Sequence, residues 1–354
     1  MNPVELAHVH SVEEFEPLAR EQIEFSAYSY IAGWAGTGWT VKANREAFAR
    51  WVLRPRVLID VSDVRLGTTV LGTPIAVPVM FAPTAIHRLV HPDGELATAR
   101  AAKQLDTLQV LSTGSSLPLE EVAAVGHKRW FQLYWFTDRG LTEELIQRAT
   151  AAGFGAIVVT VDSAVPYWRE GEERVPLILP PGVTQPNLHS DRELAYEPSL
   201  TWRSLDWLRS ISPLPIVLKG IVRADDARLA ADNGVAAIMV SNHGGRQLDT
   251  SAPTLEVLPS IVEAVDERLE VYVDGGVRRG TDVLKALALG ARAVLLGRPV
   301  QWGLGIGGEA GILRMMELVI GEFASAMGLC GCRSVDEITP ALVRRNPDPR
   351  AGLD

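Results

Sequence analysis

Eight short runs of aliphatic and β-branched residues recur along the chain, separated by segments with helical periodicity. Alternating runs of this kind are typical of βα units, in which each helix returns the chain to start the next parallel strand. Eight units are the number that closes a parallel sheet into a barrel. The sequence therefore predicts an α/β fold, the (β/α)8 or TIM barrel. The runs are PVMFAPTA (78–85), LQVLSTG (108–114), RWFQLYW (129–135), AIVVTVD (156–162), PIVLKG (215–220), AIMVSNHGG (237–245), VYVDGG (271–276) and AVLLGRPV (293–300).

The remainder of the chain fits one domain built around this barrel. An apolar content of 47% supplies a sizeable core, and single barrels regularly exceed about 250 residues. We expect one domain over residues 1–354, with an N-terminal helical segment at 1–75, the barrel at 76–330 and its last helix at 309–327. A proline-rich connection at 163–202 lacks periodicity and is predicted to be an active-site lid loop.

The charge and the terminal sequence exclude several classes of partner. A net charge of −9 without any Lys/Arg run disfavours binding to nucleic acid or to an anionic membrane. The N-terminus lacks the features of a signal peptide and no apolar stretch is long enough to span a bilayer, so we expect a cytoplasmic protein. The two cysteines, Cys330 and Cys332, are interpreted as structural, and no residue cluster has metal-ligand spacing, so no metal site is expected.

Nearly every apolar run ends on a side chain with catalytic or binding potential. Any one of these residues alone is more often a helix cap or part of a surface ion pair. Together they indicate a site, because barrel enzymes build their active sites at the C-terminal ends of the strands. The polar residues at these ends are Thr84, Ser112, Gln132, Tyr134, Thr160, Asp162, Lys219, His243, Arg246, Asp274, Arg278 and Arg298.

Three glycine-rich turns carry the most specific chemistry. VDGGVRRG (273–280) and LGRP (296–299) follow the last two strands, where barrels bind phosphate through backbone N–H groups at helix starts; ordinary βα turns are the alternative. SNHGGRQLD (241–249) places an imidazole three residues before a guanidinium. His243 there is suited to take a proton near neutral pH and Arg246 to bind a carboxylate, unless His243 is simply a core histidine.

These strings, together with APTA, FQLY, TVD and VLKG in the same order, closely resemble the FMN-dependent 2-hydroxy-acid oxidase family, from about Tyr28 to Arg333. The resemblance implies FMN as cofactor. It implies that His243 is the base, that Asp162 stabilises its imidazolium and that Tyr134 bonds to the substrate hydroxyl or to the carbonyl that forms from it. It also implies that Arg246, Tyr30 and Arg169 bind the substrate carboxylate. The implied FMN-binding residues are Pro83, Thr84, Ala85, Ser112, Gln132, Thr160, Lys219, Ser241, Asp274, Gly276, Arg278, Gly297 and Arg298, with Lys219 beside N1 and O2 of the flavin.

Departures from the family pattern bear on the substrate. Gly114 stands where glycolate oxidase has a tryptophan, which predicts space for a larger side group, and Gly114 is counted as a substrate-binding position. The loop from Glu172 to Leu200 is shorter than in glycolate oxidase, and His87 and Arg88 are expected to face the substrate mouth.

We therefore expect oxidation of an (S)-2-hydroxy acid to the 2-oxo acid, with O2 reduced to H2O2 and a bulky, mandelate-type substrate. The alternatives are a lactate-type oxidase or monooxygenase and a dehydrogenase linked to a quinone or carrier. A more remote alternative is a non-catalytic barrel that binds flavin or phosphate. A homotetramer is the expected assembly.

Overall fold

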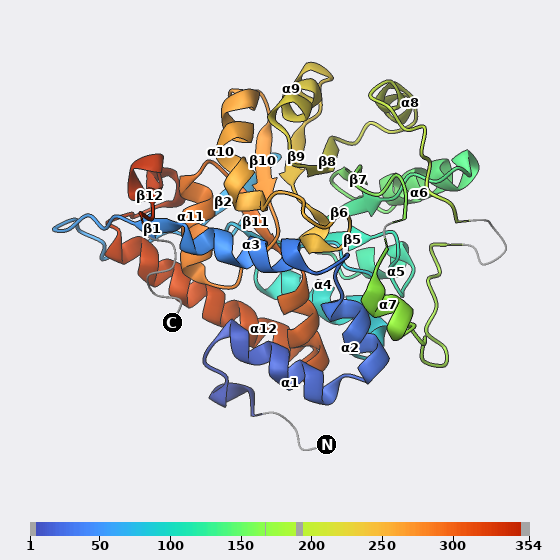
Figure 1. Cartoon of the computed structure of the whole chain (residues 1–354), viewed down its shortest axis with the longest axis horizontal. Helices are drawn as coiled ribbons and strands as arrows, with labels where there is room; N and C mark the ends of the chain where they lie inside the picture. The colour runs from blue at the N-terminus through green and yellow to red at the C-terminus, as the bar shows by residue number, and fades with distance from the viewer. Residues whose placement is uncertain (1–4, 167, 189–193, 348–354) are drawn as a thin grey trace.

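A closed barrel of eight parallel strands forms the centre of the molecule, as predicted (Figure 1). The computed structural model describes residues 5–166, 168–188 and 194–347. Each predicted run contains or overlaps one barrel strand, and the last strand pairs with the first to close the ring. The barrel strands are β4 (Val79–Phe81), β5 (Leu108–Ser112), β6 (Lys128–Leu133), β7 (Ile157–Thr160), β8 (Ile216–Ile221), β9 (Ala237–Val240), β10 (Glu270–Val273) and β11 (Ala293–Leu296).

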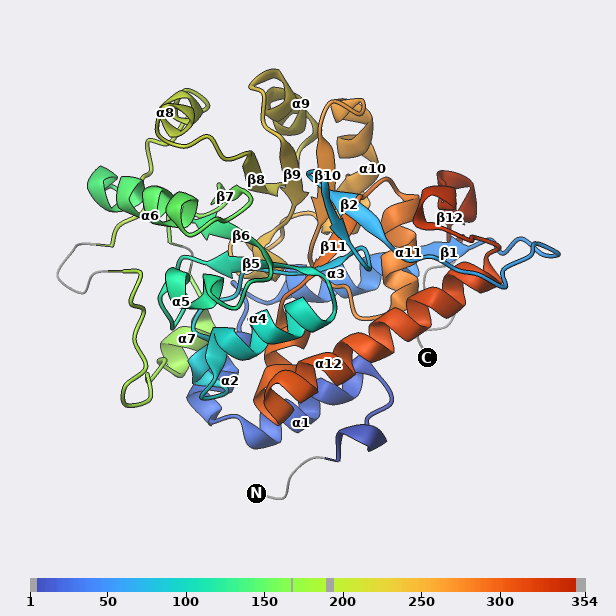
Figure 2. The ribbon, with the colours of Figure 1, turned by 180° about the vertical axis from the view of Figure 1, so that it is seen from behind.

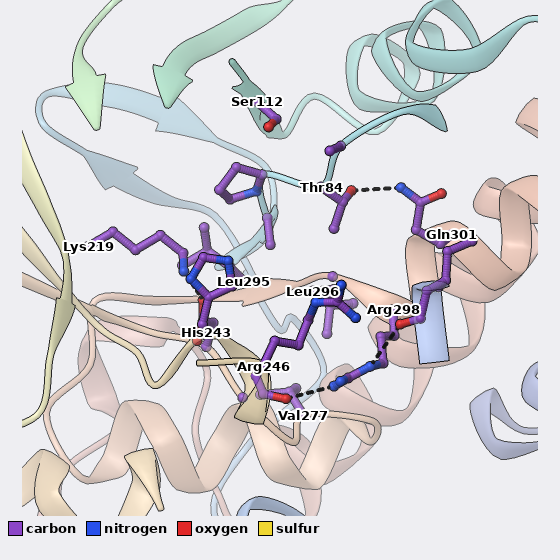
Figure 3. A pocket seen from close by; sticks show the side chains of 18 of the residues that line it. Thr84, Ser112, Lys219, His243, Arg246, Val277, Leu295, Leu296, Arg298 and Gln301 are labelled. Atoms are coloured by element: carbon purple, nitrogen blue, oxygen red, sulfur yellow. Dashed lines mark hydrogen bonds and ion pairs between the residues drawn. The ribbon is translucent and has the colours of Figure 1, made fainter. Parts of the chain in front are cut away.

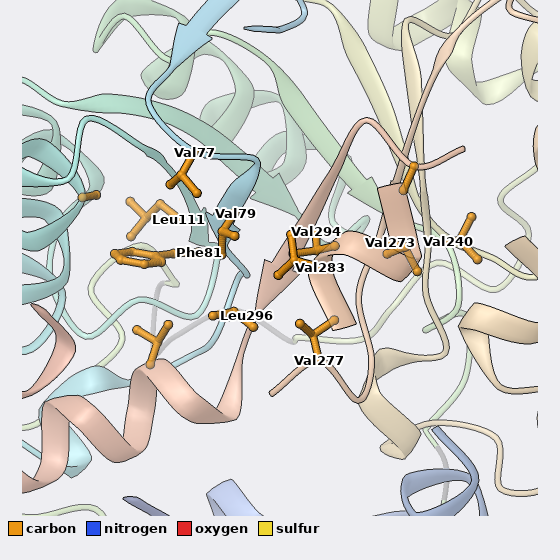
Figure 4. Packing of buried hydrophobic residues seen from close by; sticks show 14 of the residues in the cluster. Val77, Val79, Phe81, Leu111, Val240, Val273, Val277, Val283, Val294 and Leu296 are labelled. Atoms are coloured by element: carbon orange, nitrogen blue, oxygen red, sulfur yellow. The ribbon is translucent and has the colours of Figure 1, made fainter. Parts of the chain in front are cut away.

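The strands read as continuous apolar runs because both of their faces are buried. In β11, Ala293 and Leu295 belong to the cluster that fills the barrel, whereas Val294 and Leu296 belong to the larger cluster between the strands and the surrounding helices. Figure 4 shows part of this outer cluster, in which valines and leucines of neighbouring strands and of helix α11 pack together. The polar side chains at the strand ends are thereby held in place by strands that are packed on both faces.

Helices surround the barrel, and the last of them differs from its prediction. The expected helix at 309–327 is the second part of a longer element that begins at Arg298, directly after β11, and is kinked at Gly307 and Gly308. The kink requires glycine, because φ is +58° at Gly308. The helices of the barrel are α4 (Gly94–Gln104), α5 (Leu119–Ala123), α6 (Arg139–Ala151), α8 (Ser204–Ile211), α9 (Ala224–Asp232), α10 (Thr254–Val265), α11 (Gly280–Ala288) and α12 (Arg298–Leu329).

The N-terminal segment is helical only as far as Ala49, so the prediction of a helical segment to residue 75 is wrong for its last third. Its helices are η1 (Leu6–His8), η2 (Val12–Glu14), α1 (Phe15–Gln22), α2 (Phe25–Ala32) and α3 (Trp39–Ala49). Helix α1 packs along α12 (Figure 2). Strand β1 (Trp51–Leu53) then pairs with β12 (Val343–Arg345), while β2 (Thr68–Val70) and β3 (Thr73–Ile75) form a hairpin. Val70 and Ile75 of this hairpin pack onto the cluster that fills the barrel.

The expected lid loop is partly structured. It contains α7 (Glu170–Arg174) and a bridge that joins Tyr196 to Phe136. Residue 167 and residues 189–193 of the loop lie outside the described residues. The remaining short elements are η3 (His87–Leu89), η4 (His243–Gly245), η5 (Val335–Glu337) and η6 (Pro340–Leu342). No helix in the described ranges is both long enough and apolar enough to cross a membrane.

Candidate active site

A cleft of about 940 Å³, open to solvent, lies at the C-terminal ends of the barrel strands. Figure 3 shows its polar side chains converging from different strands and from the start of α12. Most of the sequence-predicted residues line it, namely Tyr30, Pro83, Thr84, Ala85, Ser112, Tyr134, Lys219, His243, Arg246, Asp274, Gly276, Arg278, Gly297 and Arg298. The other six predicted residues, Gly114, Gln132, Thr160, Asp162, Arg169 and Ser241, lie behind or beside this surface.

His243 and Asp162 form a hydrogen-bonded pair at the cleft. His243 follows β9 in the short η4 turn, and its Nδ1 lies 3.0 Å from Oδ1 of Asp162, which follows β7. The other ring nitrogen, Nε2, lies 3.5 Å from the hydroxyl oxygen of Tyr134. The backbone of His243 is left-handed, with a φ of +58°, a strained conformation for a non-glycine residue. The fold thus holds the imidazole in one orientation, with Nε2 in the cleft.

Burial, hydrogen bonds and neighbouring charges together set the protonation of these three groups. It lowers the pKa of His243 below its ordinary value, against the opposing charge of Asp162, so the ring is neutral at pH 7. Burial opposes ionisation of Asp162 as well, yet the hydrogen bond to His243 and the nearby Lys219 ammonium hold the pKa of Asp162 below its usual range. Burial raises the pKa of Tyr134 far above 10, so its hydroxyl remains a donor. The cleft therefore presents a neutral base backed by a carboxylate.

Arg246 brings positive charge to the same end of the cleft. Its Nη1 donates to the carbonyl oxygens of Tyr30 and Gly33, and its guanidinium lies 5.0 Å from the centre of the Tyr30 ring. Arg169 stands behind it and donates from Nε to the carbonyl oxygen of Arg246. Of the three residues expected to bind a carboxylate, Arg246 and Tyr30 line the cleft, and Arg169 contacts it through Arg246.

Residues of the N-terminal segment hold the loop that carries His243 and Arg246. Asn44 of α3 and Asn242 form a reciprocal pair of amide hydrogen bonds, each 2.9 Å long. Asp249, at the end of the same loop, accepts hydrogen bonds from the backbone N–H groups of Thr37 and Thr40. Sequence reasoning missed these anchors, because a lone asparagine in a helix carries no recognisable signal.

Arg278, Arg298 and the glycine turn after β10 form a second part of the cleft, and Arg298 lies beside Arg246, because both donate to the carbonyl oxygen of Gly33. Arg278 and Arg298 are partly buried, and this burial lowers the pKa of Arg278 to about 10 and of Arg298 to about 9, so both remain charged. Neither is paired with a carboxylate in the described part of the chain. Gly275 and Gly276 have φ values of 94° and 89°, and a Cβ on Gly276 would lie 2.4 Å from the carbonyl oxygen of Asn44. These turns fit a phosphate group.

Buried polar atoms also face the cleft. The Lys219 ammonium donates to Oγ of Ser241 at 2.9 Å and lies 3.3 Å from Oδ2 of Asp274. The other Asp274 oxygen, Oδ1, is buried without a hydrogen-bond partner among the described residues, as expected for a group that accepts from a ligand hydroxyl. Beneath the cleft surface, the side chain of Gln132 accepts a hydrogen bond from the hydroxyl of Ser112 and donates one to the hydroxyl oxygen of Thr160, which fixes both hydroxyl groups.

Gly114 is covered by a residue that sequence reasoning missed. Gln185, from the predicted lid loop, donates from Nε2 to the carbonyl oxygen of Gly114, and a Cβ on Gly114 would lie 2.7 Å from that Nε2. The space that a larger residue would fill is thus partly taken by a flexible amide. The loop is fixed here by the buried Asn187, which accepts from the N–H of Leu119.

The expectation that His87 and Arg88 face the substrate mouth is wrong for His87. Its ring is 2% exposed and lies beneath Thr84, with Nε2 2.8 Å from the Thr84 hydroxyl oxygen. Arg88 is exposed and donates to the carbonyl oxygen of Pro92. Gln301, in the first turns of α12, is a further missed residue: it lines the cleft and donates to Thr84. A polar residue within the apolar stretch PVQWGL was its only sequence signal.

The two cysteines are buried and unpaired, as expected. Within the described ranges, no group of three or more His, Cys, Asp or Glu side chains is arranged to hold a metal ion.

Comparison with known proteins places this cleft in a family. The family model of the FMN-dependent dehydrogenases matches residues 19–345. The chain is 48% identical over 352 residues to an L-lactate oxidase of Nostoc sp., covering 93% of this chain and 96% of the relative. It is 44% identical to glycolate oxidase 3 of Arabidopsis thaliana, covering 96% and 97%. A solved mandelate oxidase variant with (S)-mandelic acid superposes with a TM-score of 0.91 at 43% identity, covering 96% of this chain and 98% of that one.

The residues present fit FMN. Its phosphate matches Arg278, Arg298 and the glycine turns, its ribityl hydroxyls match the unpartnered Asp274 oxygen, and the charge on its reduced ring matches the buried Lys219. The chain belongs to the FMN-dependent dehydrogenase family, as an enzyme that uses FMN to oxidise 2-hydroxy acids.

Proposed function

We propose that the protein oxidises an (S)-2-hydroxy acid with a bulky, mandelate-type side group and passes the electrons to O2. The products are the 2-oxo acid and H2O2, so two electrons and two protons leave the substrate and both appear in the peroxide. FMN, when bound, accepts the two electrons from the carbon that carries the hydroxyl. The observation that carries the proposal is the neutral His243, backed by Asp162 and placed beside Arg246 in one cleft.

His243 is the proposed base. Its Nε2 accepts a proton from the substrate, and the resulting imidazolium is stabilised by Asp162 through the 3.0 Å contact at Nδ1. Tyr134 keeps its proton and donates to the substrate oxygen next to that nitrogen. Arg246 binds the substrate carboxylate, with Tyr30 beside it and Arg169 as a second cation. The two ends of the substrate are thereby fixed before the proton moves.

A bulky side group is supported by Gly114 and by the solved structures that superpose on this chain, and Gln185 leaves room for it if its amide moves. Gly114 contributes no side chain beside Ala85, which lines the cleft. Gln185, which now covers Gly114, is only partly buried and ends in a flexible amide, so a ring can displace it. Among the solved mandelate oxidases that superpose on this chain, one is described with (S)-mandelic acid and another with benzoyl-formic acid.

A lactate-type oxidase is the second candidate. Gln185 favours it, because with the amide above Gly114 the room beside the cleft suits a methyl group better than a phenyl ring. The L-lactate oxidase of Nostoc sp. is also the relative at 48% identity.

One set of experiments decides between the candidates. The holoenzyme is mixed without oxygen with glycolate, lactate, mandelate and 3-phenyllactate, as single enantiomers, and bleaching of the flavin absorbance gives the rate of reduction. Faster bleaching with the aromatic (S)-acids supports our proposal, and faster bleaching with lactate supports the second candidate. Admission of air then separates the electron acceptors: peroxide in amounts equal to the oxo acid indicates an oxidase, decarboxylated acid a monooxygenase, and slow reoxidation a carrier-linked dehydrogenase.

We also propose a cytoplasmic homotetramer. Val57, Leu58 and Leu329 are 78%, 101% and 75% exposed, and large exposed apolar side chains are suited to subunit contacts. Light scattering coupled to size-exclusion chromatography measures the assembly, and a monomeric mass would contradict this proposal.

A further inference from the structure

Three buried residues and the partly exposed Thr84 form a chain of hydrogen bonds that ends at the cofactor cleft. Gln301 donates from Nε2 to the hydroxyl oxygen of Thr84, and Nε2 of His87 lies 2.8 Å from the same oxygen. Nδ1 of His87 lies 2.9 Å from the hydroxyl of Thr98 in α4. His87 and Gln301 are each 2% exposed, and both Thr84 and Gln301 line the cleft. The line Thr98, His87, Thr84, Gln301 is called here the Thr84 relay.

The backbone is strained where the relay turns. Ile86 has a left-handed φ of +52°, which is costly for a β-branched residue and lets the chain fold back so that His87 lies under Thr84. Two hydrogen bonds hold this turn: the N–H of Ile86 donates to Gly114, and the N–H of His87 donates to the fully buried Glu95. Backbone strain that is held by two hydrogen bonds indicates that the position of His87 under Thr84 is functionally important.

The directions of the hydrogen bonds follow from counting protons. Thr98 is buried, and its hydroxyl has only His87 as partner among the described residues, so it donates to Nδ1; the opposite direction would leave its proton without an acceptor. His87 is neutral, because burial lowers its pKa. The ring therefore carries its proton on Nε2 and donates it to Thr84.

These directions determine which hydrogen-bonding groups of Thr84 and Gln301 remain available to a ligand. A hydroxyl oxygen accepts two hydrogen bonds, and the N–H groups of Gln301 and His87 supply both. The single proton of Thr84 is left to point into the cleft. Oε1 of Gln301 is buried without a hydrogen-bond partner in the described ranges, so it is free to accept from a ligand. The cleft thus presents one fixed donor and one fixed acceptor side by side.

We propose that His87 and Gln301 are positioning residues that turn Thr84 into a dedicated hydrogen-bond donor to FMN. Thr84 donates to an acceptor atom of the cofactor, and Gln301 accepts from one of its N–H or hydroxyl groups. Because reduction increases the electron density on the ring, a hydrogen bond donated to it stabilises the reduced form more than the oxidised form. The relay thereby raises the reduction potential of the flavin and tightens its binding, whichever 2-hydroxy acid is the substrate.

A double-mutant cycle tests this coupling without any substrate. FMN is titrated into apoprotein and followed by quenching of its fluorescence, and the reduction potential is measured against a reference dye. Thr84→Val, which keeps the side-chain shape, should weaken FMN binding by about 5- to 10-fold and lower the potential. His87→Leu and Gln301→Leu should each act in the same direction by about 2- to 5-fold. His87→Leu combined with Thr84→Val should have no more effect than Thr84→Val alone.

Two further variants keep the result interpretable. His87→Gln retains a donor that reaches Thr84 and should restore near wild-type binding and potential. His127→Leu removes a buried histidine near the other end of the barrel, before β6, and should change neither quantity. If His87→Leu does not fold, the cycle between Gln301→Leu and Thr84→Val carries the same test. Additive effects in the cycle, an unchanged Thr84→Val variant, or a His87→Gln variant that behaves like His87→Leu would each overturn the proposal.

Discussion

His243 combines three properties that a general base needs. Its ring is neutral at pH 7, its Nε2 faces the cleft, and its Nδ1 is held by an ionised Asp162. The strained backbone at His243 is tolerated because the neighbouring glycines let α3 approach: a Cβ on Gly245 would lie 2.6 Å from Cγ2 of Val41. The position of His243 is thus determined by the packing of α3 against its loop as well as by the hydrogen bond to Asp162.

Replacement of this base should stop reduction of the flavin and leave the cofactor bound. His243→Ala should slow anaerobic bleaching by a substrate acid by about 10²- to 10⁴-fold, because the base acts on the substrate and not on FMN. Asp162→Asn should slow it less, since the imidazolium loses only its charged partner. FMN content, read from the absorption spectrum, is the control. Near-normal bleaching in His243→Ala would remove His243 from the mechanism.

Arg246 should be irreplaceable by lysine. A lysine ammonium is a point charge and cannot form the two parallel hydrogen bonds by which a guanidinium binds a carboxylate. We expect Arg246→Lys to raise KM by about 10- to 100-fold with a smaller change in kcat. Arg88→Lys, at an exposed arginine bonded to Pro92, is the matched control and should be silent. Equal turnover of the acid and its methyl ester by the wild type would contradict carboxylate binding.

Gln185 and Gly114 should set the size of the accepted side group. Gln185→Ala opens the space above Gly114, so the ratio of kcat/KM for mandelate to that for lactate should rise by about tenfold. Gly114→Trp fills that space and should lower the ratio, because the amide of Gln185 can yield but the ring remains. Steady-state kinetics with both acids give the ratio. An unchanged ratio in both variants would mean that other residues limit the size of the substrate side group.

At the level of elements, helix α3 serves as a clamp on the loop after β9. The amide pair between Asn44 and Asn242 joins the two, and Asn44 also accepts from the N–H of Thr254 at the start of α10. Three segments far apart in the sequence therefore meet at one buried side chain.

Loss of this clamp should cost both stability and activity. Asn44→Ala leaves the amide of Asn242 without its side-chain partner, which should lower the free energy of unfolding by about 2–3 kcal/mol. The loop with His243 should loosen, so kcat should fall as well. Asn233→Ala removes an exposed amide that bonds to Leu229 and is the control. Urea denaturation measures the effect, and equal midpoints for the two variants would show that the clamp is not needed.

The elements also show where sequence reasoning succeeds and where it fails. The eight barrel strands were predictable because burial on both faces gives long apolar runs. The strands of three residues at Trp51–Leu53, Thr68–Val70 and Thr73–Ile75 were not, because they are too short to show a pattern and, for Trp51–Leu53, because the partner strand lies almost 300 residues away at Val343–Arg345. The same holds at the site: strand-end residues were found from their position, whereas Gln185 and Gln301 reach the cleft only through the packing of a loop and a helix.

On the scale of the whole molecule, the barrel holds a histidine that burial keeps neutral. His127 lies just before β6, is 7% exposed, and neither ring nitrogen has a hydrogen-bond partner in the described part of the chain. Burial first, and then the positive charges of Arg129 and Lys103, lower the pKa of His127 to about 4. In the unfolded chain the same ring has its ordinary pKa near 6.5.

Stability should therefore fall as the solution becomes acidic. Between pH 6.5 and pH 4 the unfolded chain binds a proton that the folded protein does not, so the stabilisation is complete above pH 6.5 and is lost below it. The loss is on the order of 3 kcal/mol at this one residue.

His127→Leu should flatten the dependence of stability on pH, and it should be neutral or stabilising at pH 7.5, because it removes two unsatisfied nitrogens. Urea midpoints of the holoenzyme at pH 7.5 and pH 5 measure the slope, with His8→Leu at an exposed histidine as control. Since burial also lowers the pKa values of His87 and of the partly buried His243, part of the slope should persist in His127→Leu, and an unaltered slope would place the acid sensitivity at those two residues.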